Sequence, residues 1–160
     1  MLEIVTPGLY STVQDRGRAG YYAMGIPPSG AMDLFAHDAA NALVGNSTSA
    51  ATIELTFMGP TITFREFSLI AVTGAEVEVT LDGERIPLWM SQVVRAGQTL
   101  HFGSMNAGAR AYIAVRGGVE VPLVMESRST YVASGLGGHL GRTLQAGDSL
   151  PVGELAAAGT

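Results

Sequence analysis

The chain has 160 residues, of which 47% are hydrophobic and 14% are charged, against about 25% charged residues in a typical domain. This length suits one domain with a proper core, and the composition rules out an intrinsically disordered chain. Nine arginines and no lysine stand against fourteen acids, a net charge of −5, which argues against a nucleic-acid-binding face and a polybasic membrane anchor. The absence of lysine and cysteine excludes Schiff bases, a P-loop lysine, disulfides and thiol catalysis.

The first ten residues, MLEIVTPGLY, carry an acid at position 3 and no apolar run of the kind found in a signal peptide. No apolar stretch approaches the roughly 18 residues of a membrane span. We therefore expect a cytoplasmic protein with neither a membrane nor a nucleic acid as its partner.

Short segments with strand-like alternation, separated by turns, dominate the chain. In 52–57 the apolar side chains Ile53, Leu55 and Phe57 share one face, with Glu54 on the other. Asp82-Gly83 is a strong hairpin signal. Strands are predicted at 2–6, 9–13, 52–57, 61–65, 68–73, 76–81, 86–89, 91–95, 98–102 and 110–115.

One segment, 33–44, has the pattern of a helix. Asp33 suits the N-cap, and Gly45-Asn46 supplies a stop. The pattern places a set of apolar residues toward the core and His37 and Asn41 on the more polar side. The apolar set is Leu34, Phe35, Ala39, Leu43 and Val44.

About ten short strands with one helix predict a mainly β fold, and a barrel is favoured because it removes exposed strand edges. We expect the barrel to occupy residues 1–152, followed by a linker or tail at 153–160.

The segment 11–33 is polar and rich in glycine and proline, which is typical of a long structured loop that carries function. It ends at the start of the helix, whose free N–H groups suit an anion or oxyanion. A structural interpretation stays open: Asp15 paired with Arg16 or Arg18 would pin the loop, and Ser29 and Asp33 would cap the helix.

Two further clusters carry possible chemistry. In 126–130 (ESRST), an arginine flanked by hydroxyls suits a carboxylate or phosphate, although a turn with an exposed arginine explains it equally well. The run 135–142 (GLGGHLGR) lacks the strand-to-helix context of a dinucleotide site and is interpreted as a glycine-rich turn. The histidines at 37, 101 and 139 show no ligand spacing, so no metal site is predicted.

Six blocks of this sequence, in order along the chain, carry a family resemblance. They are STVQDRGRAGYYAMGIPPSGAMD (11–33), AANALVGN (39–46), IELTFMGP (53–60), AVTGAEVEV (71–79), YIAVRGGVEVP (112–122) and ESRSTYVASGLGGHLGRTLQAGDSL (126–150). The series resembles the biotin-dependent carboxyltransferase-like family, also called allophanate hydrolase subunit 2. Its members include the carboxyltransferase part of urea amidolyase, the C-type subunit of the bacterial 5-oxoprolinase and an antagonist of a sporulation-kinase inhibitor.

The resemblance implies a cyclophilin-like β-barrel and a site between two such halves. Members of the family are about twice as long, so this chain corresponds to the N-terminal half, and we expect it to be inactive alone. The implied partners are the missing C-terminal half, a companion resembling allophanate hydrolase subunit 1, and a small-molecule amide substrate.

The resemblance also implies candidate site residues, which are carried over by position. The catalytic candidates are Asp15, Arg18, Ser29 and Asp33. The substrate-binding candidates are Gln14, Gly30, Thr73, Gly74 and Arg128. Arg18 or Arg128 would bind a carboxylate or phosphorylated intermediate, and Asp15 would orient Arg18 or handle a proton. The Ser29-Gly30 loop would offer N–H donors to an oxyanion.

Three functions follow as hypotheses. The first is a subunit of an ATP-dependent amide-hydrolysing complex, most simply one acting on 5-oxoproline. The second is a carboxyltransferase that uses carboxybiotin and urea; this lysine-free chain cannot itself carry biotin. The third is a non-catalytic regulatory antagonist that binds a kinase-inhibitor companion. We expect no cofactor bound by the chain alone, with ATP used by the complex.

Overall fold

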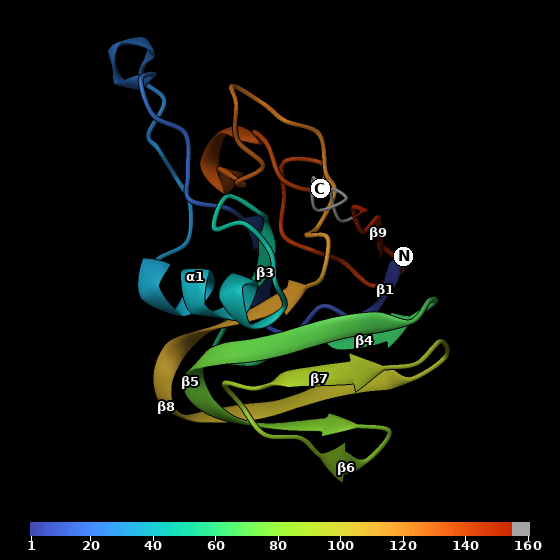
Figure 1. Ribbon diagram of the computed structural model, residues 1–160. Coiled ribbons are helices and arrows are strands. Elements are labelled where there is room, and N and C mark those ends of the chain that lie inside the picture. The colour runs from blue at the N-terminus through green and yellow to red at the C-terminus, as the bar shows by residue number, and fades with distance from the viewer. Residues whose placement is uncertain (155–160) are drawn as a thin grey trace.

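The computed structural model describes residues 1–154, and within them the strands form one antiparallel sheet, accompanied by a single α-helix (Figure 1). The strands are β1 (Leu2–Thr6), β2 (Tyr10–Gln14), β3 (Thr52–Thr56), β4 (Thr61–Phe64), β5 (Ser68–Leu81), β6 (Glu84–Arg85), β7 (Ser91–Val94), β8 (Thr99–Val115) and β9 (Ser149–Leu150). The helix is α1 (Leu34–Leu43), and short 3-10 turns occupy Tyr22–Met24 and Val132–Ser134. The prediction of a mainly β fold with one main helix is confirmed.

Strand β8 organises the sheet. Its first residues pair with β4 and its last residues with β3, while its other edge pairs along most of β5. The hydrogen-bonded order is β2-β3-β8-β4-β1-β9, with β6 and β7 attached to β5. In Figure 1 the two long strands β5 and β8 run side by side and bend strongly beneath α1. This bend curls the sheet into a half-barrel.

The bend joins segments that the sequence pattern separates. Residues 68–73 and 76–81 form one strand, β5, and residues 98–102 and 110–115 belong to one strand, β8. The pairing of β5 with β8 shifts register between Gly74 and Val79, and irregular pairing of this kind bends a strand without ending it. The predicted strand at 86–89 is absent from the described residues, where β6 ends at Arg85.

The core follows the alternation of the strands. Ile53 and Leu55 of β3 pack inward with the apolar side chains of β4, β5 and β8, as the sequence predicts. The other face of β3 is also buried, and Glu54 lies in it rather than in solvent. This buried polar face positions the site described below.

Helix α1 begins where the sequence predicts, because the Asp33 side chain accepts a hydrogen bond from Ala36 N at 3.0 Å. The prediction of its apolar side is right only at the end of the helix, where Val44 is buried and Leu43 packs against the core. Phe35 is 77% exposed, whereas His37 and Asn41 are fully buried. Small Ala36 and Ala40 let the helix lie close to the sheet, and Asn41 donates to Ala50 O at 2.9 Å, so Asn41 is satisfied inside the protein.

No helix in residues 1–154 is long and apolar enough to cross a membrane. The predicted tail at 153–160 lies mostly outside the described residues, and its character stays a prediction.

Candidate functional site

The middle of the predicted loop, residues 17–30, forms an arm that projects from the body of the molecule beside α1 (Figure 1). The outgoing and returning chain segments of the arm meet at its base, where Arg18 N donates to Pro28 O at 2.7 Å. Gly17 and Gly30 cross there with φ values of 94° and 90°. A Cβ on Gly30 would lie 2.7 Å from Gly17 N, so only glycine permits this crossing.

Asp15 ties the arm to the distant segment 126–130. Its Oδ1 accepts hydrogen bonds from Gly17 N at 2.8 Å and Ser127 Oγ at 2.7 Å, and its Oδ2 accepts one from Arg128 N at 2.6 Å. The structure thereby brings together the two polar clusters found in the sequence, which are more than 100 residues apart.

Arg18 lies inside the molecule and is only 2% exposed. Its Nη2 donates to Ser129 O at 2.6 Å, and its Nη1 is buried without a hydrogen-bond partner within the described residues. Burial lowers the pKa of Arg18, while the nearby charge of Asp15 acts in the opposite direction. Gln14 is also buried and donates to Thr130 O at 3.3 Å.

A hollow of about 260 Å³ opens beside Asp15 and Arg128. Both arginines on its wall already have carboxylate partners. Arg128 contacts Glu120 Oε1 at 2.5 Å and donates from Nε to Val121 O, and Arg16 contacts Asp38. Each of these arginines therefore already has one carboxylate partner.

A larger cleft of about 510 Å³ opens at the start of α1. Its walls come from Met32-Asp33, from 74–76 of β5 and from 107–110 of β8. Gly74 has φ 100° and belongs to the bulged part of β5, and Thr73 Oγ1 donates to Ala36 O at 2.6 Å. Asp33 and Gly74 line the cleft, while Thr73 lies buried behind it and holds the helix.

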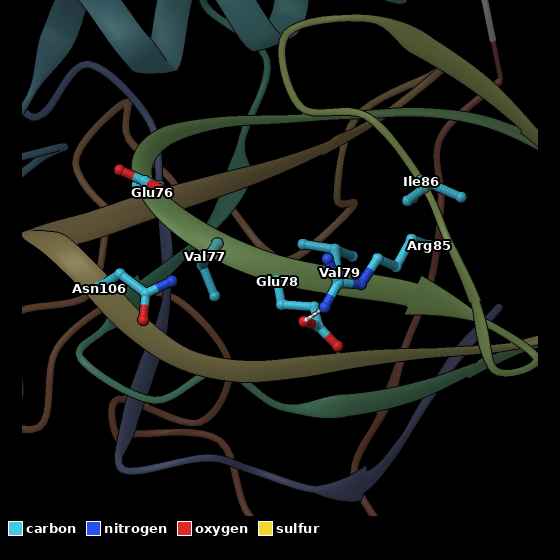
Figure 2. A pocket seen from close by; sticks show the side chains of 7 residues that line it. All are labelled: Glu76, Val77, Glu78, Val79, Arg85, Ile86 and Asn106. Atoms are coloured by element: carbon cyan, nitrogen blue, oxygen red, sulfur yellow. Dashed lines mark hydrogen bonds and ion pairs between the residues drawn. The ribbon is translucent and has the colours of Figure 1, made fainter.

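A second hollow, of about 300 Å³, adjoins the same bend (Figure 2). Figure 2 shows Glu76 and Asn106 where β5 and β8 turn, and Glu78 facing Arg85, with which it forms an ion pair. Glu76 lines both this hollow and the larger cleft.

A buried polar cluster lies next to the cleft. Glu54 Oε2 accepts hydrogen bonds from Tyr112 Oη at 2.7 Å and Met32 N at 2.8 Å, while Tyr112 Oη accepts one from Asp33 N. Burial, with the charge of Glu54, raises the pKa of Tyr112. Arg110 Nε lies 3.8 Å from Glu54 Oε1.

The site residues thus fall into two groups. One surrounds the base of the arm: Gln14, Asp15, Arg18, Ser29, Gly30 and Arg128. The other lies at the start of α1 and the bend of the sheet: Asp33, Thr73 and Gly74.

Sequence reasoning missed Glu54, Arg110 and Tyr112. The one signal was an acid, Glu54, among β-branched and apolar residues, and alternation alone assigns such a residue to solvent. The described residues hold no group of three or more His, Cys, Asp or Glu suited to a metal ion.

Comparison with known proteins identifies the family. Residues 24–160 match the family described as carboxyltransferase domain, subdomain A and B. The chain belongs to this carboxyltransferase domain family. It is 42% identical over 154 residues to the C-type subunit of 5-oxoprolinase from Escherichia coli and 43% identical over 150 residues to urea amidolyase of Saccharomyces cerevisiae.

The alignments to these relatives cover nearly the whole of this chain but only part of each relative. The alignment to the 5-oxoprolinase subunit takes in 96% of this chain and 50% of that subunit; this chain spans 8% of the yeast urea amidolyase. The crystal structure of the K. lactis urea amidolyase is similar over 96% of this chain and 9% of that one, with 39% identity and a TM-score of 0.94. The family resemblance inferred from the sequence blocks is confirmed.

Proposed function

We propose that this chain supplies part of an ATP-dependent amide-hydrolysing complex of the 5-oxoprolinase type, together with a companion resembling allophanate hydrolase subunit 1. The observation that carries the proposal is the alignment to the C-type subunit of 5-oxoprolinase, which takes in 96% of this chain and half of the relative. The chain has no lysine, so any phosphate-binding lysine that ATP requires would come from a companion.

The proposed site lies where the arm base and the start of α1 meet the sheet. The hydrogen bonds of Asp15 and Arg18 favour positioning roles, in which these side chains hold the arm and the 126–130 segment in register. The residues that we propose to act nearer the substrate are Ser29, Gly30, Asp33 and Arg128, with Gln14, Thr73 and Gly74 supporting them.

A second function is favoured by the similarity to urea amidolyase, in sequence and in structure. In that case the chain would hold carboxybiotin, carried by another domain, next to a urea-type substrate, so that the carboxyl group leaves the biotin nitrogen for the urea nitrogen and the proton of that nitrogen returns to biotin.

Reconstitution of the chain with its companions separates the two functions. The first predicts ATP hydrolysis that depends on 5-oxoproline. Carboxylation of urea on addition of a biotin carrier, without 5-oxoproline turnover, would overturn it.

Arg128 is tested within the active complex. Arg128→Ala should lower kcat by about tenfold or more, because a charge-assisted contact is worth about 1.5–3 kcal/mol. Arg95→Ala is the control, since Arg95 is exposed and its side chain makes no hydrogen bond within the described residues. Equal turnover by the two variants would contradict the proposed role of Arg128 near the substrate.

A further inference from the structure

The two residues that precede helix α1 are held by side chains of the sheet. Met32 N donates to Glu54 Oε2 at 2.8 Å, and Asp33 N donates to Tyr112 Oη at 2.8 Å. These N–H groups lie ahead of the first helical turn, so no hydrogen bond within the helix can satisfy them. The oxygen atoms that do satisfy them come from β3 and β8, which are distant in the sequence.

Glu54 and Tyr112 form one fixed pair of acceptors. They lie opposite each other in the register of β3 and β8, and Tyr112 Oη donates to Glu54 Oε2 at 2.7 Å. Glu54 is 7% exposed and Tyr112 is fully buried. Burial, with the charge of Glu54, raises the pKa of Tyr112, so the phenol keeps the proton that it donates to Glu54. The pair thus presents two oxygen atoms side by side at one place on the sheet.

The same contacts set the place of Asp33 at the edge of the cleft. The hydrogen bond to Tyr112 fixes the backbone of Asp33, and its Oδ1 is held as the N-cap of α1 by Ala36 N at 3.0 Å. Its Oδ2 makes no hydrogen bond within the described residues, and the residue is exposed and lines the cleft. One carboxylate oxygen is therefore held, and the other is available to a ligand.

We infer that Tyr112 and Glu54 are positioning residues, which hold the backbone of 32–33 so that the free carboxylate oxygen of Asp33 keeps a fixed place in the site. The inference deepens the proposed function and rests on it for the role of Asp33. Neither Tyr112 nor Glu54 touches the substrate in this role, because both act through the backbone. The loss in rate can be large, since a displacement of about 1 Å near the reacting groups can cost about 100-fold.

Amide hydrogen exchange, followed by NMR on the whole chain, tests the contacts without an activity assay. Tyr112→Phe removes one oxygen atom and should speed exchange of the Asp33 amide by about tenfold or more. Glu54→Gln keeps the side-chain shape but replaces a charged acceptor with a neutral one, so exchange of the Met32 amide should rise several-fold. Tyr10→Phe is the matched control, because Tyr10 is exposed on β2, and it should leave both amides unchanged.

Two exchange results would contradict the inference. One is unchanged exchange of the Met32 and Asp33 amides in folded variants. The other is an equal rise at the amides of β1 and β4, because the pair would then support the whole fold and not this segment in particular. If Tyr112→Phe does not fold, Glu54→Gln carries both this test and the next.

Turnover by the reconstituted complex tests whether the pair acts through Asp33. Tyr112→Phe should lower kcat by about tenfold with KM nearly unchanged, because a displaced Asp33 weakens the transition state more than substrate binding. In a chain that already carries Asp33→Asn, adding Tyr112→Phe should lower kcat no further. An equal loss with and without Asp33 would overturn the inference. If Asp33→Asn abolishes turnover, the single variant decides, and a raised KM with unchanged kcat contradicts the inference.

The two measurements also separate this inference from the proposed function. If the complex does not turn over 5-oxoproline, the proposed function falls, and exchange of the Met32 and Asp33 amides still decides whether the pair holds the segment. If the complex turns over 5-oxoproline and Tyr112→Phe matches the wild type in kcat, only the positioning role falls.

Discussion

Asp15 shows how one side chain links distant parts of the chain. Its carboxylate accepts three hydrogen bonds, one from the arm and two from Ser127 and Arg128. Local sequence allows Asp15 to pair with a neighbouring arginine, but its observed partners are two N–H groups and a hydroxyl, two of them more than 100 residues away. No local pattern could identify those partners, because only the fold places them there.

Asp148 provides a residue-scale prediction of pH dependence. Its two carboxylate oxygens accept from Arg142 Nη1 and Nη2 at 2.8 Å each, and its side chain is only 10% exposed. The hydrogen bonds from Arg142 lower the pKa of Asp148 from 3.8 to about 2. Because the pKa of Asp148 is lower in the folded chain than in the unfolded chain, its ionised form stabilises the fold. This stabilisation is complete at pH values well above the usual pKa of 3.8, and it is lost as the pH falls through about 2.

Asp148→Asn should therefore lower the free energy of unfolding by about 2 kcal/mol at about pH 6, and the difference from the wild type should shrink steadily between about pH 5 and pH 2. Urea denaturation at several pH values measures it. A difference that stays constant over this range would show that the charge of Asp148 contributes nothing.

The β5–β8 bend is the element on which the larger cleft depends. Strand alternation predicts the two halves of each long strand but leaves a break between them, because the bulged residues interrupt the period of two. Gly74 sits in this break with φ 100°. The family resemblance marks Gly74 as a site residue, and the structure adds a conformational reason for glycine there.

Gly74→Ala should destabilise the fold by about 1–3 kcal/mol, since a left-handed φ is strained for alanine and its Cβ would lie 2.6 Å from Arg110 O. Gly103→Ala is the matched control: Gly103 lies in β8, has no positive φ, and its Cβ would meet Glu78 at an ordinary 3.6 Å. Thermal unfolding compares the two. Equal melting temperatures for both variants would mean that the bend tolerates a side chain.

At the scale of the whole molecule, the arm is the part with the least support. Tyr22 at its tip is 73% exposed, and the described hydrogen bonds of 21–26 stay within the tip itself. An exposed loop held only at its base opens locally more easily than the sheet does.

Limited digestion with chymotrypsin should therefore cut first at Tyr21 or Tyr22, splitting the chain into pieces of about 22 and 138 residues, as read by mass spectrometry. Replacing both tyrosines by serine should slow this first cut. A first cut after Phe67, which is also exposed but directly precedes β5, would show that the arm is better protected than the sheet edge.

Features that depend on neighbouring residues follow from the sequence alone: the alternating strands, the Asp33 cap that begins α1, the polar loop and the family blocks. These signals are local, since the period of a strand and the geometry of a cap are set within a few residues. Long-range packing instead selects the buried side of α1, because Ala36 and Ala40 admit a close approach to the sheet and the buried Asn41 finds Ala50 O. Packing also puts Glu54 inside, next to Arg110 and Tyr112, because the chain just before α1 folds over β3 and Met32 N donates to Glu54 Oε2.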